Sequence, residues 1–330
     1  MAYFKETIIG LLFILTISCE KKEFDRQYLL PVDSILDTES TYIAILGDIQ
    51  SYTYSEDYMP FLEYTMNWLR SQKRHGKNVV CILQDGDVTN GNTSVEWQRF
   101  NRVTETAAEE ILYVASTGNH DYDWDKDNKI IGRRTTHISK YASFPLTLSK
   151  IEACYESGRI ENMVIHNEIY GSRYDILVLE FGPRKEVLKW AQDYVSSHPD
   201  HNFLLLTHEY LTSEGKRITN DSHAELQLKN TTWSVPEDIW QKLVKNNDNI
   251  VCVLCGHNGF SSQLFTTNSF GREVPQILFN LQFLENGGDG WIQLWEFPPQ
   301  SDTVNVSVYN TIRREIHPDK STKFKFRYRY

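Results

Sequence analysis

Basic charge is scarce in this sequence. Lys and Arg total 34 against 44 Asp and Glu, which gives a net charge of -10 at pH 7. This balance argues against binding to nucleic acid, because such proteins neutralise phosphates with basic side chains. It still permits a phosphate ester as substrate, because bound divalent metals supply local positive charge.

Cysteine is also scarce, with 5 in the whole chain. Cys252 and Cys255 have the spacing of a redox or zinc motif. They lie in an apolar run that predicts a strand, where residues three apart point to opposite faces. We therefore interpret them as separate buried thiols.

No apolar run is long enough to cross a bilayer, which takes about 20 residues. The run 8–17 is short enough to be the apolar centre of a signal peptide. It ends in Thr16-Ile17-Ser18-Cys19, which resembles the lipobox of bacterial lipoproteins. We expect 1–19 to be a signal peptide with lipidated Cys19, 20–40 a linker, and the protein to be exported and anchored to the bacterial cell envelope. The alternatives are an ordinary cleaved signal and an unprocessed membrane anchor.

Five apolar runs along the chain are each followed by a short polar patch. Short apolar runs of this kind are typical of buried strands. The patches are Gly47-Asp48-Ile49-Gln50, Gly86-Asp87-Val88-Thr89-Asn90, Gly118-Asn119-His120-Asp121, Thr207-His208 and Gly256-His257. Ligands gather at the carboxyl ends of strands in open α/β sheets, and Asp, Asn and His side chains bind metals. The pattern predicts a metal-dependent hydrolase.

The segments between these runs predict helices and one insertion. Helical spacing of apolar residues covers 58–72 and 186–197, and Thr93-x-x-Glu96 is a capping box that opens another helix. Residues 122–160 show no clear periodicity, and we interpret them as an insertion on the active-site face. We expect one α/β domain over 41–330, ending in a strand at 324–330 with aromatic and basic residues on opposite faces.

In this order, the patches resemble those of the calcineurin-like metallophosphoesterase family over roughly 42–310. Gly118-Asn119-His120-Asp121 matches the most specific block of the family, and Gly86-Asp87-Val88-Thr89-Asn90 matches its Gly-Asp-x-x-Asn/Asp block. The pattern at 286–291 looks like that of secreted bacterial members. The resemblance implies a four-layer α-β-β-α sandwich of two mixed sheets flanked by helices. It also implies two divalent metals and hydrolysis of a phosphomonoester or phosphodiester by a metal-activated water.

The resemblance also assigns roles to residues. Asp87 would bridge the metals, with Asn119, His208 and His257 completing a first metal position and Asp48 and Gln50 belonging to a second. His120 would act beside the phosphate as general acid or electrostatic stabiliser, held by Asp121. Asn90 would order the Asp87 loop from outside the ligand set.

The second metal position departs from the family pattern. Gln50 stands where the family has one histidine, and Gly259 stands where it has another. An amide oxygen is a harder and weaker ligand than imidazole, which suits Mn, Mg or Ca better than Zn. Three outcomes stay open: two metals with one weakly held, one metal with substrate-assisted recruitment of the second, or metal binding without turnover. The identity of the metals stays open among Mn, Fe, Zn, Mg and Ca.

The substrate is less well specified. Arg133 and Arg134 follow the His120 loop and would clamp a substrate phosphate, unless they are a solvated charge pair. We expect a small-molecule, glycan or lipid phosphate ester. The alternative function is a surface-anchored binding lipoprotein that keeps the fold without turnover, for which the 13% aromatic content would supply stacking surfaces.

Overall fold

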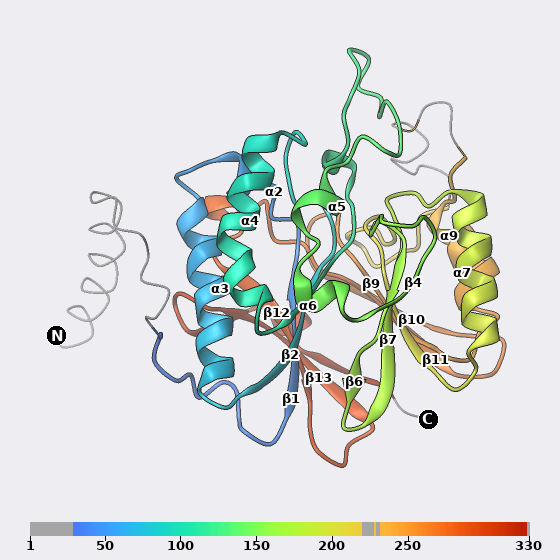
Figure 1. Cartoon of the computed structure of the whole chain (residues 1–330). Helices are drawn as coiled ribbons and strands as arrows, with labels where there is room; N and C mark the ends of the chain where they lie inside the picture. The colour runs from blue at the N-terminus through green and yellow to red at the C-terminus, as the bar shows by residue number, and fades with distance from the viewer. Residues whose placement is uncertain (1–28, 220–227, 229–231, 329–330) are drawn as a thin grey trace.

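Two mixed β-sheets packed face to face form the centre of the molecule, with helices on both outer sides (Figure 1). The computed structural model describes residues 29–219, 228 and 232–328. The expected four-layer α-β-β-α arrangement is therefore confirmed. The expected signal peptide and Cys19 lie outside the described residues.

The seven-stranded sheet contains the first three strands of the chain side by side and parallel. Its order is β14 (Glu315–Ile316), β13 (Thr303–Asn310), β12 (Trp291–Phe297), β1 (Thr41–Leu46), β2 (Asn78–Gln84) and β3 (Leu112–Ala115), with β15 (Phe324–Arg327) paired to β13. The C-terminal strands thus extend this sheet in antiparallel fashion from β1.

The eight-stranded sheet has a parallel centre of four strands, β11, β9, β8 and β7. Its order is β10 (Ser262–Thr267), β11 (Glu273–Leu278), β9 (Ile250–Cys255), β8 (Asn202–Leu206), β7 (Ser172–Val178), β5 (Met163–Ile165) and β4 (Ile151–Cys154), with β6 (Glu168–Ile169) paired to β7.

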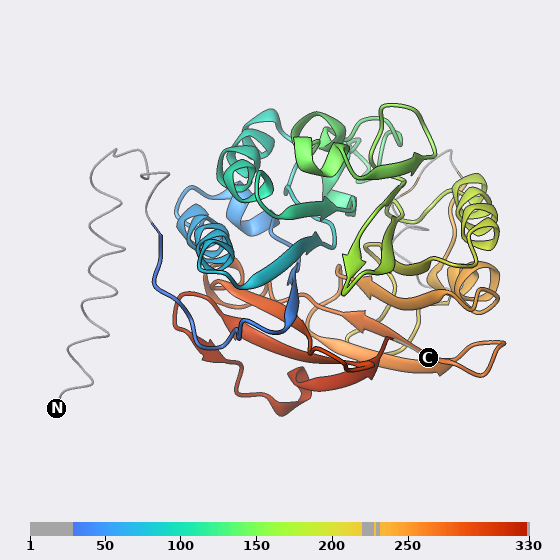
Figure 2. The same ribbon diagram turned by 60° about the horizontal axis from the view of Figure 1, so that its bottom comes forward.

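Helices cover the two outer faces. α3 (Met59–Arg74) and α4 (Ser94–Ala108) lie on the outside of the seven-stranded sheet (Figures 1 and 2). α7 (Lys185–Ser197) and α9 (Pro236–Ile239), which continues as the π-helical turn η2 (Trp240–Val244), lie on the outside of the other sheet. The shorter α2 (Gln50–Tyr54), α5 (Ile138–Tyr141) and α6 (Pro145–Leu148) belong to connecting segments.

The two faces of the central strands enter different cores. In β8, Leu204 and Leu206 belong to the large core that includes the space between the sheets, whereas Phe203 and Leu205 pack under α7 and η2. Cys252 and Cys255 of β9 divide in the same way and are both free thiols. Because side chains alternate between the two faces of a strand, these cysteines do not share a CxxC site, as expected.

α4 begins where the sequence predicts. The Thr93 hydroxyl accepts a hydrogen bond from Glu96 N at 3.3 Å, and Glu96 Oε2 accepts one from Thr93 N at 3.0 Å. The same Glu96 carboxylate also accepts hydrogen bonds from the backbone N–H groups of Asn90 and Gly91. The capping box thus ties the helix to the loop that follows β2.

Residues 29–40, expected to be the end of a linker, pack against the domain instead. Asp33 is buried, and its carboxylate accepts hydrogen bonds from Trp68 Nε1 and the Tyr309 hydroxyl. Leu30 and Leu36 are buried beside it in the main core. Residues 29–40 are therefore part of the folded domain, because two leucines and a hydrogen-bonded carboxylate lie within this otherwise polar segment.

The expected insertion at 122–160 contains α5, α6 and β4, joined by loops. Part of it packs as a small separate core in which Tyr122, Ile130 and Phe181 are buried. The terminal strand alternates as predicted over its described part, with Phe326 buried between exposed Lys325 and Arg327. Within 29–219, 228 and 232–328, no helix has the length and apolar character to cross a membrane.

Candidate metal centre

The carboxyl ends of β2, β3, β8 and β9 meet at one place, and two glycines make this approach possible. A Cβ on Gly118 would lie 2.1 Å from Asp87 Oδ1, and a Cβ on Gly86 would lie 2.4 Å from His208 Nδ1. Gly86 also has φ of +116°, which side chains rarely adopt. The glycines of the Gly-Asp and Gly-Asn-His patches are therefore required by close packing around the ligands.

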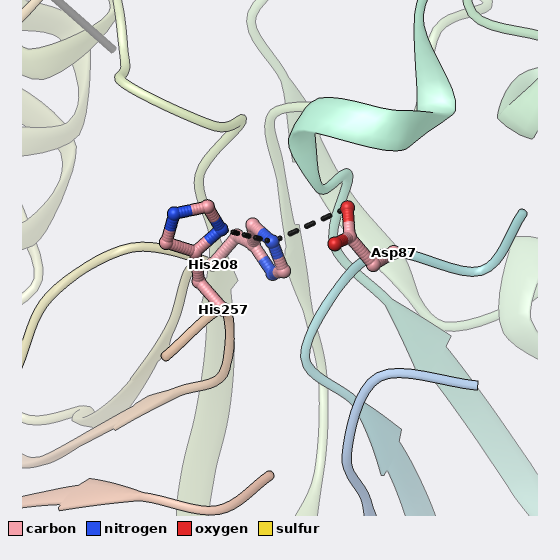
Figure 3. A group of neighbouring side chains, drawn as sticks. All are labelled: Asp87, His208 and His257. Carbon is pink, nitrogen blue, oxygen red and sulfur yellow. Dashed lines mark hydrogen bonds and ion pairs between the residues drawn. The ribbon is translucent and has the colours of Figure 1, made fainter. Parts of the chain in front are cut away.

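Three side chains converge on one atom of a fourth, His208 Nε2, and Figure 3 shows two of them, Asp87 and His257, beside His208. This atom lies 3.3 Å from Asp87 Oδ1, 3.3 Å from Asn119 Oδ1 and 3.2 Å from His257 Nδ1. The ligand atoms of Asp87, His208 and His257 all lie within 4.8 Å of one another. The structure thus brings together the whole first metal position expected from the sequence.

The spacing of these atoms fits a divalent metal. Ligands held about 2.1 Å from a tetrahedral metal are about 3.4 Å from one another, close to the separations from His208 Nε2. The set combines one carboxylate, one amide oxygen and two imidazoles, which suits Mn, Fe or Zn. His208 and Asn119 are almost fully buried, so these donors face each other rather than water.

A backbone contact fixes the orientation of the His208 ring. Nδ1 lies 2.9 Å from the carbonyl oxygen of Asp85, so we assign the Nδ1 proton to that hydrogen bond. Nε2 then faces the other ligands. A ring oriented in this way by its second nitrogen is typical of metal-binding histidines.

The electric field at this position favours a cation. Burial opposes ionisation of Asp87, but the charge and hydrogen bond of His208, together with His120 and His257, lower the pKa of its carboxyl well below the usual range. Burial also opposes protonation of His208, yet the Asp87, Asp48 and Asp85 carboxylates raise the pKa of its imidazole to about 10. A divalent cation bound at Nε2 would displace this proton.

At the second metal position expected from the sequence, amide side chains surround Asp48. Asp48 Oδ1 accepts a hydrogen bond from His257 N at 3.1 Å, and Oδ2 accepts from Asn280 Nδ2 at 2.7 Å and Gln282 Nε2 at 2.8 Å. Gln50 Nε2 donates to Gln282 Oε1 at 2.8 Å. Gln50 Oε1 is buried and has no hydrogen-bond partner among the described residues. Gln282 thus links Gln50 to Asp48, and an amide oxygen without a partner is a ligand that suits a hard cation.

The surroundings of Asp48 favour the protonated form of its carboxyl. Burial raises the pKa of its carboxyl to about 8, and the charge of Asp87 adds to this effect while His208 opposes it. Cation binding at this position therefore releases a proton below that pH.

His120 is oriented by Asn90 rather than by Asp121. The ring Nδ1 of His120 lies 2.8 Å from the Asn90 carbonyl oxygen, and its backbone N–H donates to Asp87 Oδ1 at 2.9 Å. Asn90 thus acts through its backbone, and its side chain is exposed. Because Glu96 accepts the Asn90 N–H, the cap of α4 supports the ring position.

Asp121 instead joins two loops. Its carboxylate accepts hydrogen bonds from the backbone N–H groups of Gly118 at 2.9 Å, Val88 at 3.1 Å and Thr89 at 2.8 Å. Burial and the Asp87 charge raise the pKa of Asp121 to about 6, against these hydrogen bonds. The residue positions the ligand loops and does not contact the His120 ring.

Arg133 and Arg134, expected to clamp a phosphate, are held elsewhere. Arg133 is buried and donates to the carbonyl oxygens of Phe181 and Gly182. Arg134 is largely exposed and pairs with Glu156 at 2.8 Å. The first joins the 122–160 insertion to the end of β7, and the second belongs to a surface ion pair.

Replacing Arg133 with alanine is expected to lower the free energy of unfolding by about 2 kcal/mol, because two buried carbonyls lose charged donors. The effect is measured by urea denaturation. Arg134→Ala is the matched control and should stay within about 0.5 kcal/mol of wild type. An Arg133→Ala protein of unchanged stability with a raised KM would instead restore the substrate role.

Sequence reasoning missed three polar residues near Asp48. Asn280 and Gln282 follow β11, a sixth strand whose end lies beside the other five. Asp85 precedes the Gly86-Asp87 patch and is fully buried. The strand-end rule applies to the first two as well, because β11 ends at Leu278 and both follow it within four residues.

Comparisons with known proteins identify the family of the chain. A family model described as calcineurin-like phosphoesterase matches residues 41–274. The chain is 23% identical over 270 residues to the uncharacterized protein YvnB of Bacillus subtilis strain 168, covering 78% of this chain and 19% of that protein. It therefore spans about a fifth of the length of that curated relative.

Two solved structures are similar to the chain at low identity. The structure of PhoD has a TM-score of 0.47 and 12% identity, with 91% of this chain and 72% of that chain covered. The 5'-nucleotidase precursor from Thermus thermophilus has a TM-score of 0.42 and 12% identity, with 84% and 53% covered.

The family match covers most of the chain and includes the turns that carry Asp48, Asp87, Asn119, His208 and His257. This family typically uses divalent metals, and its membership supports phosphoester hydrolysis. The chain belongs to the calcineurin-like phosphoesterase family.

Proposed function

We propose that this chain hydrolyses a phosphate ester with divalent metals held at the first and second metal positions. The observation that carries the proposal is the convergence of Asp87, Asn119 and His257 on His208 Nε2 at 3.2 to 3.3 Å. Divalent metals bound there neutralise phosphate oxygens and lower the pKa of an attacking water.

The residues around this centre supply positioning and proton transfer. Asp87 connects the His120 loop to the metal ligands, because its Oδ1 accepts the His120 N–H and lies beside the His208 ring. His120 keeps Nδ1 on the Asn90 carbonyl, which leaves Nε2 as the ring atom for the leaving oxygen. As the imidazolium, His120 would donate a proton from Nε2 to that oxygen.

We also propose that the protein is exported and anchored to the cell envelope by a lipid on Cys19. The support is the sequence alone: the apolar run 8–17 followed by Thr16-Ile17-Ser18-Cys19. Metabolic labelling with a fatty acid tests this, with Cys19→Ser as the variant that should lose the label.

Removing metal is expected to abolish hydrolysis and to lower thermal stability. Cation binding cancels the repulsion among the buried carboxylates, and a ligand at 100 times its Kd stabilises a protein by about 2.7 kcal/mol. The experiment measures hydrolysis of p-nitrophenyl phosphate and bis-p-nitrophenyl phosphate, together with Tm, before and after chelation and after return of Mn, Mg, Ca, Fe or Zn. Absence of hydrolysis with every metal would exclude the enzymatic function.

A second candidate function is a binding protein without turnover. The second metal position lacks both imidazoles, and the exposed rings of Phe260 and Phe283 follow His257 and Gln282 in sequence. These rings would stack on an organic ligand. Ligand binding that is unchanged in metal-free protein, combined with no hydrolysis, would favour this function.

A further inference from the structure

The carboxylate of Asp85 is a buried acidic group with no partner. Asp85 directly follows β2, its side chain is fully buried, and neither oxygen makes a hydrogen bond with any residue that the structure describes. Burying a lone carboxylate is costly, so such a group in a folded protein needs a cation, a proton or water.

The Asp85 carboxylate lies beside Asp48. A Cβ placed on Gly256 would be 2.5 Å from Asp48 Oδ1 and 2.6 Å from Asp85 Oδ1, so both carboxylates crowd the same point. Gly256 is the residue before His257, and its lack of a side chain admits them both. Asp85 is also joined to the first metal position, because its carbonyl oxygen holds the His208 ring at 2.9 Å.

The second metal position has donors that are still uncommitted. Gln50 Oε1 is buried without a partner among the described residues. Asp48 accepts one hydrogen bond at Oδ1 and two at Oδ2, which leaves lone pairs on a carboxylate with about four acceptor sites. Two oxygen donors without a hydrogen-bond partner among the described residues therefore belong to the surroundings of Asp48: Asp85 lies beside it, and Gln50 is linked to it through Gln282.

We infer that Asp85 takes over as a metal ligand at the second metal position, where its carboxylate joins that of Asp48 in an oxygen donor set to which Gln50 adds its amide oxygen. Such a set selects hard cations such as Mn or Mg over Zn, which prefers nitrogen and sulfur donors. The inference rests on the proposed function, since it assumes metal at this centre. Asp85 is not a member of the five strand-end patches, so the inference adds a ligand to those expected from the sequence.

The test is metal binding rather than hydrolysis. Calorimetric titration of the purified, metal-stripped protein with MnCl2 should show two sites in wild type. In Asp85→Asn the second site should be at least about tenfold weaker. Asp175→Asn is the matched control, because that buried carboxylate already pairs with Arg173 and His201 and should leave both sites intact.

Thermal unfolding separates a ligand from a purely structural residue. Metal-free Asp85→Asn should melt at or above the wild-type temperature, since a buried acidic group is replaced by a neutral amide, while its Mn-induced rise in Tm should shrink. Gln50→His should increase affinity for Zn at the second site, because an imidazole returns.

Three results are decisive. Two unchanged Mn sites in Asp85→Asn would overturn the inference. A wild type that hydrolyses esters with a single bound metal would overturn it while leaving the proposed function standing. A wild type that binds no metal would overturn both.

Discussion

Asp87→Ala is expected to reduce hydrolysis by about 10³-fold or more. Asp87 is the one carboxylate that lies beside His208 and also receives the His120 backbone N–H, so its loss removes a ligand and releases the His120 loop. Metal stabilisation of a phosphoryl transition state is worth several kcal/mol, and about 1.4 kcal/mol corresponds to tenfold in rate. The measurement is kcat/KM with a generic phosphate ester, together with bound metal per chain.

The control for Asp87→Ala is a substitution of a buried carboxylate outside the metal centre. Asp175→Asn removes a charge that lies on β7 and pairs with Arg173, and its activity per folded molecule should match wild type. Equal activity of Asp87→Ala and wild type would remove the basis for a metal centre at these strand ends.

His120→Asn is expected to lower kcat by about 10²- to 10⁴-fold, the range of general acid–base catalysis. The ring is not part of the converging set around His208 Nε2, so metal content should be unchanged. The backbone N–H contact with Asp87 does not involve the ring, so the substitution leaves it in place, whereas the contact of the ring with the Asn90 carbonyl is lost. Steady-state kinetics measures this loss, and the difference in kcat between His120→Asn and wild type should be largest for an ester with a poor leaving group.

A substrate with a good leaving group distinguishes proton donation from electrostatic stabilisation. If His120 donates a proton, His120→Asn should be much less impaired on p-nitrophenyl esters, whose leaving oxygen needs no proton. The control is His317→Asn, since His317 lies near the edge strand β14 and contacts Trp291. A loss of bound metal in His120→Asn would contradict the role assigned here.

The fold and the first metal position could be predicted because local patterns agree with tertiary structure. The apolar runs are buried strands on which both faces are covered, and the parallel strands must place their carboxyl ends together. The position of Asp87 and His208 follows from that rule alone. The capping box at Thr93 and the opposite faces of Cys252 and Cys255 are equally local properties.

The remaining features depend on contacts that sequence spacing does not encode. Arg133 follows the His120 loop in sequence, yet three-dimensional packing turns its guanidinium toward carbonyl oxygens after β7. Asp121 is adjacent to His120, but neighbours in a 3-10 turn point apart, and the carboxylate joins backbone N–H groups instead. Asp85 could be identified only from the structure, because the observations that single it out are its burial and its lack of hydrogen-bond partners among the described residues.

The most direct test of the central claim is a titration of activity against bound metal. Metal-stripped wild-type protein should show no hydrolysis of bis-p-nitrophenyl phosphate or p-nitrophenyl phosphate. Activity should return in proportion to Mn bound per chain, and His257→Ala should recover little of it, because one ligand of the converging set is missing. Full activity in the stripped protein, or full recovery in His257→Ala, would contradict a metal-dependent phosphoesterase at this site.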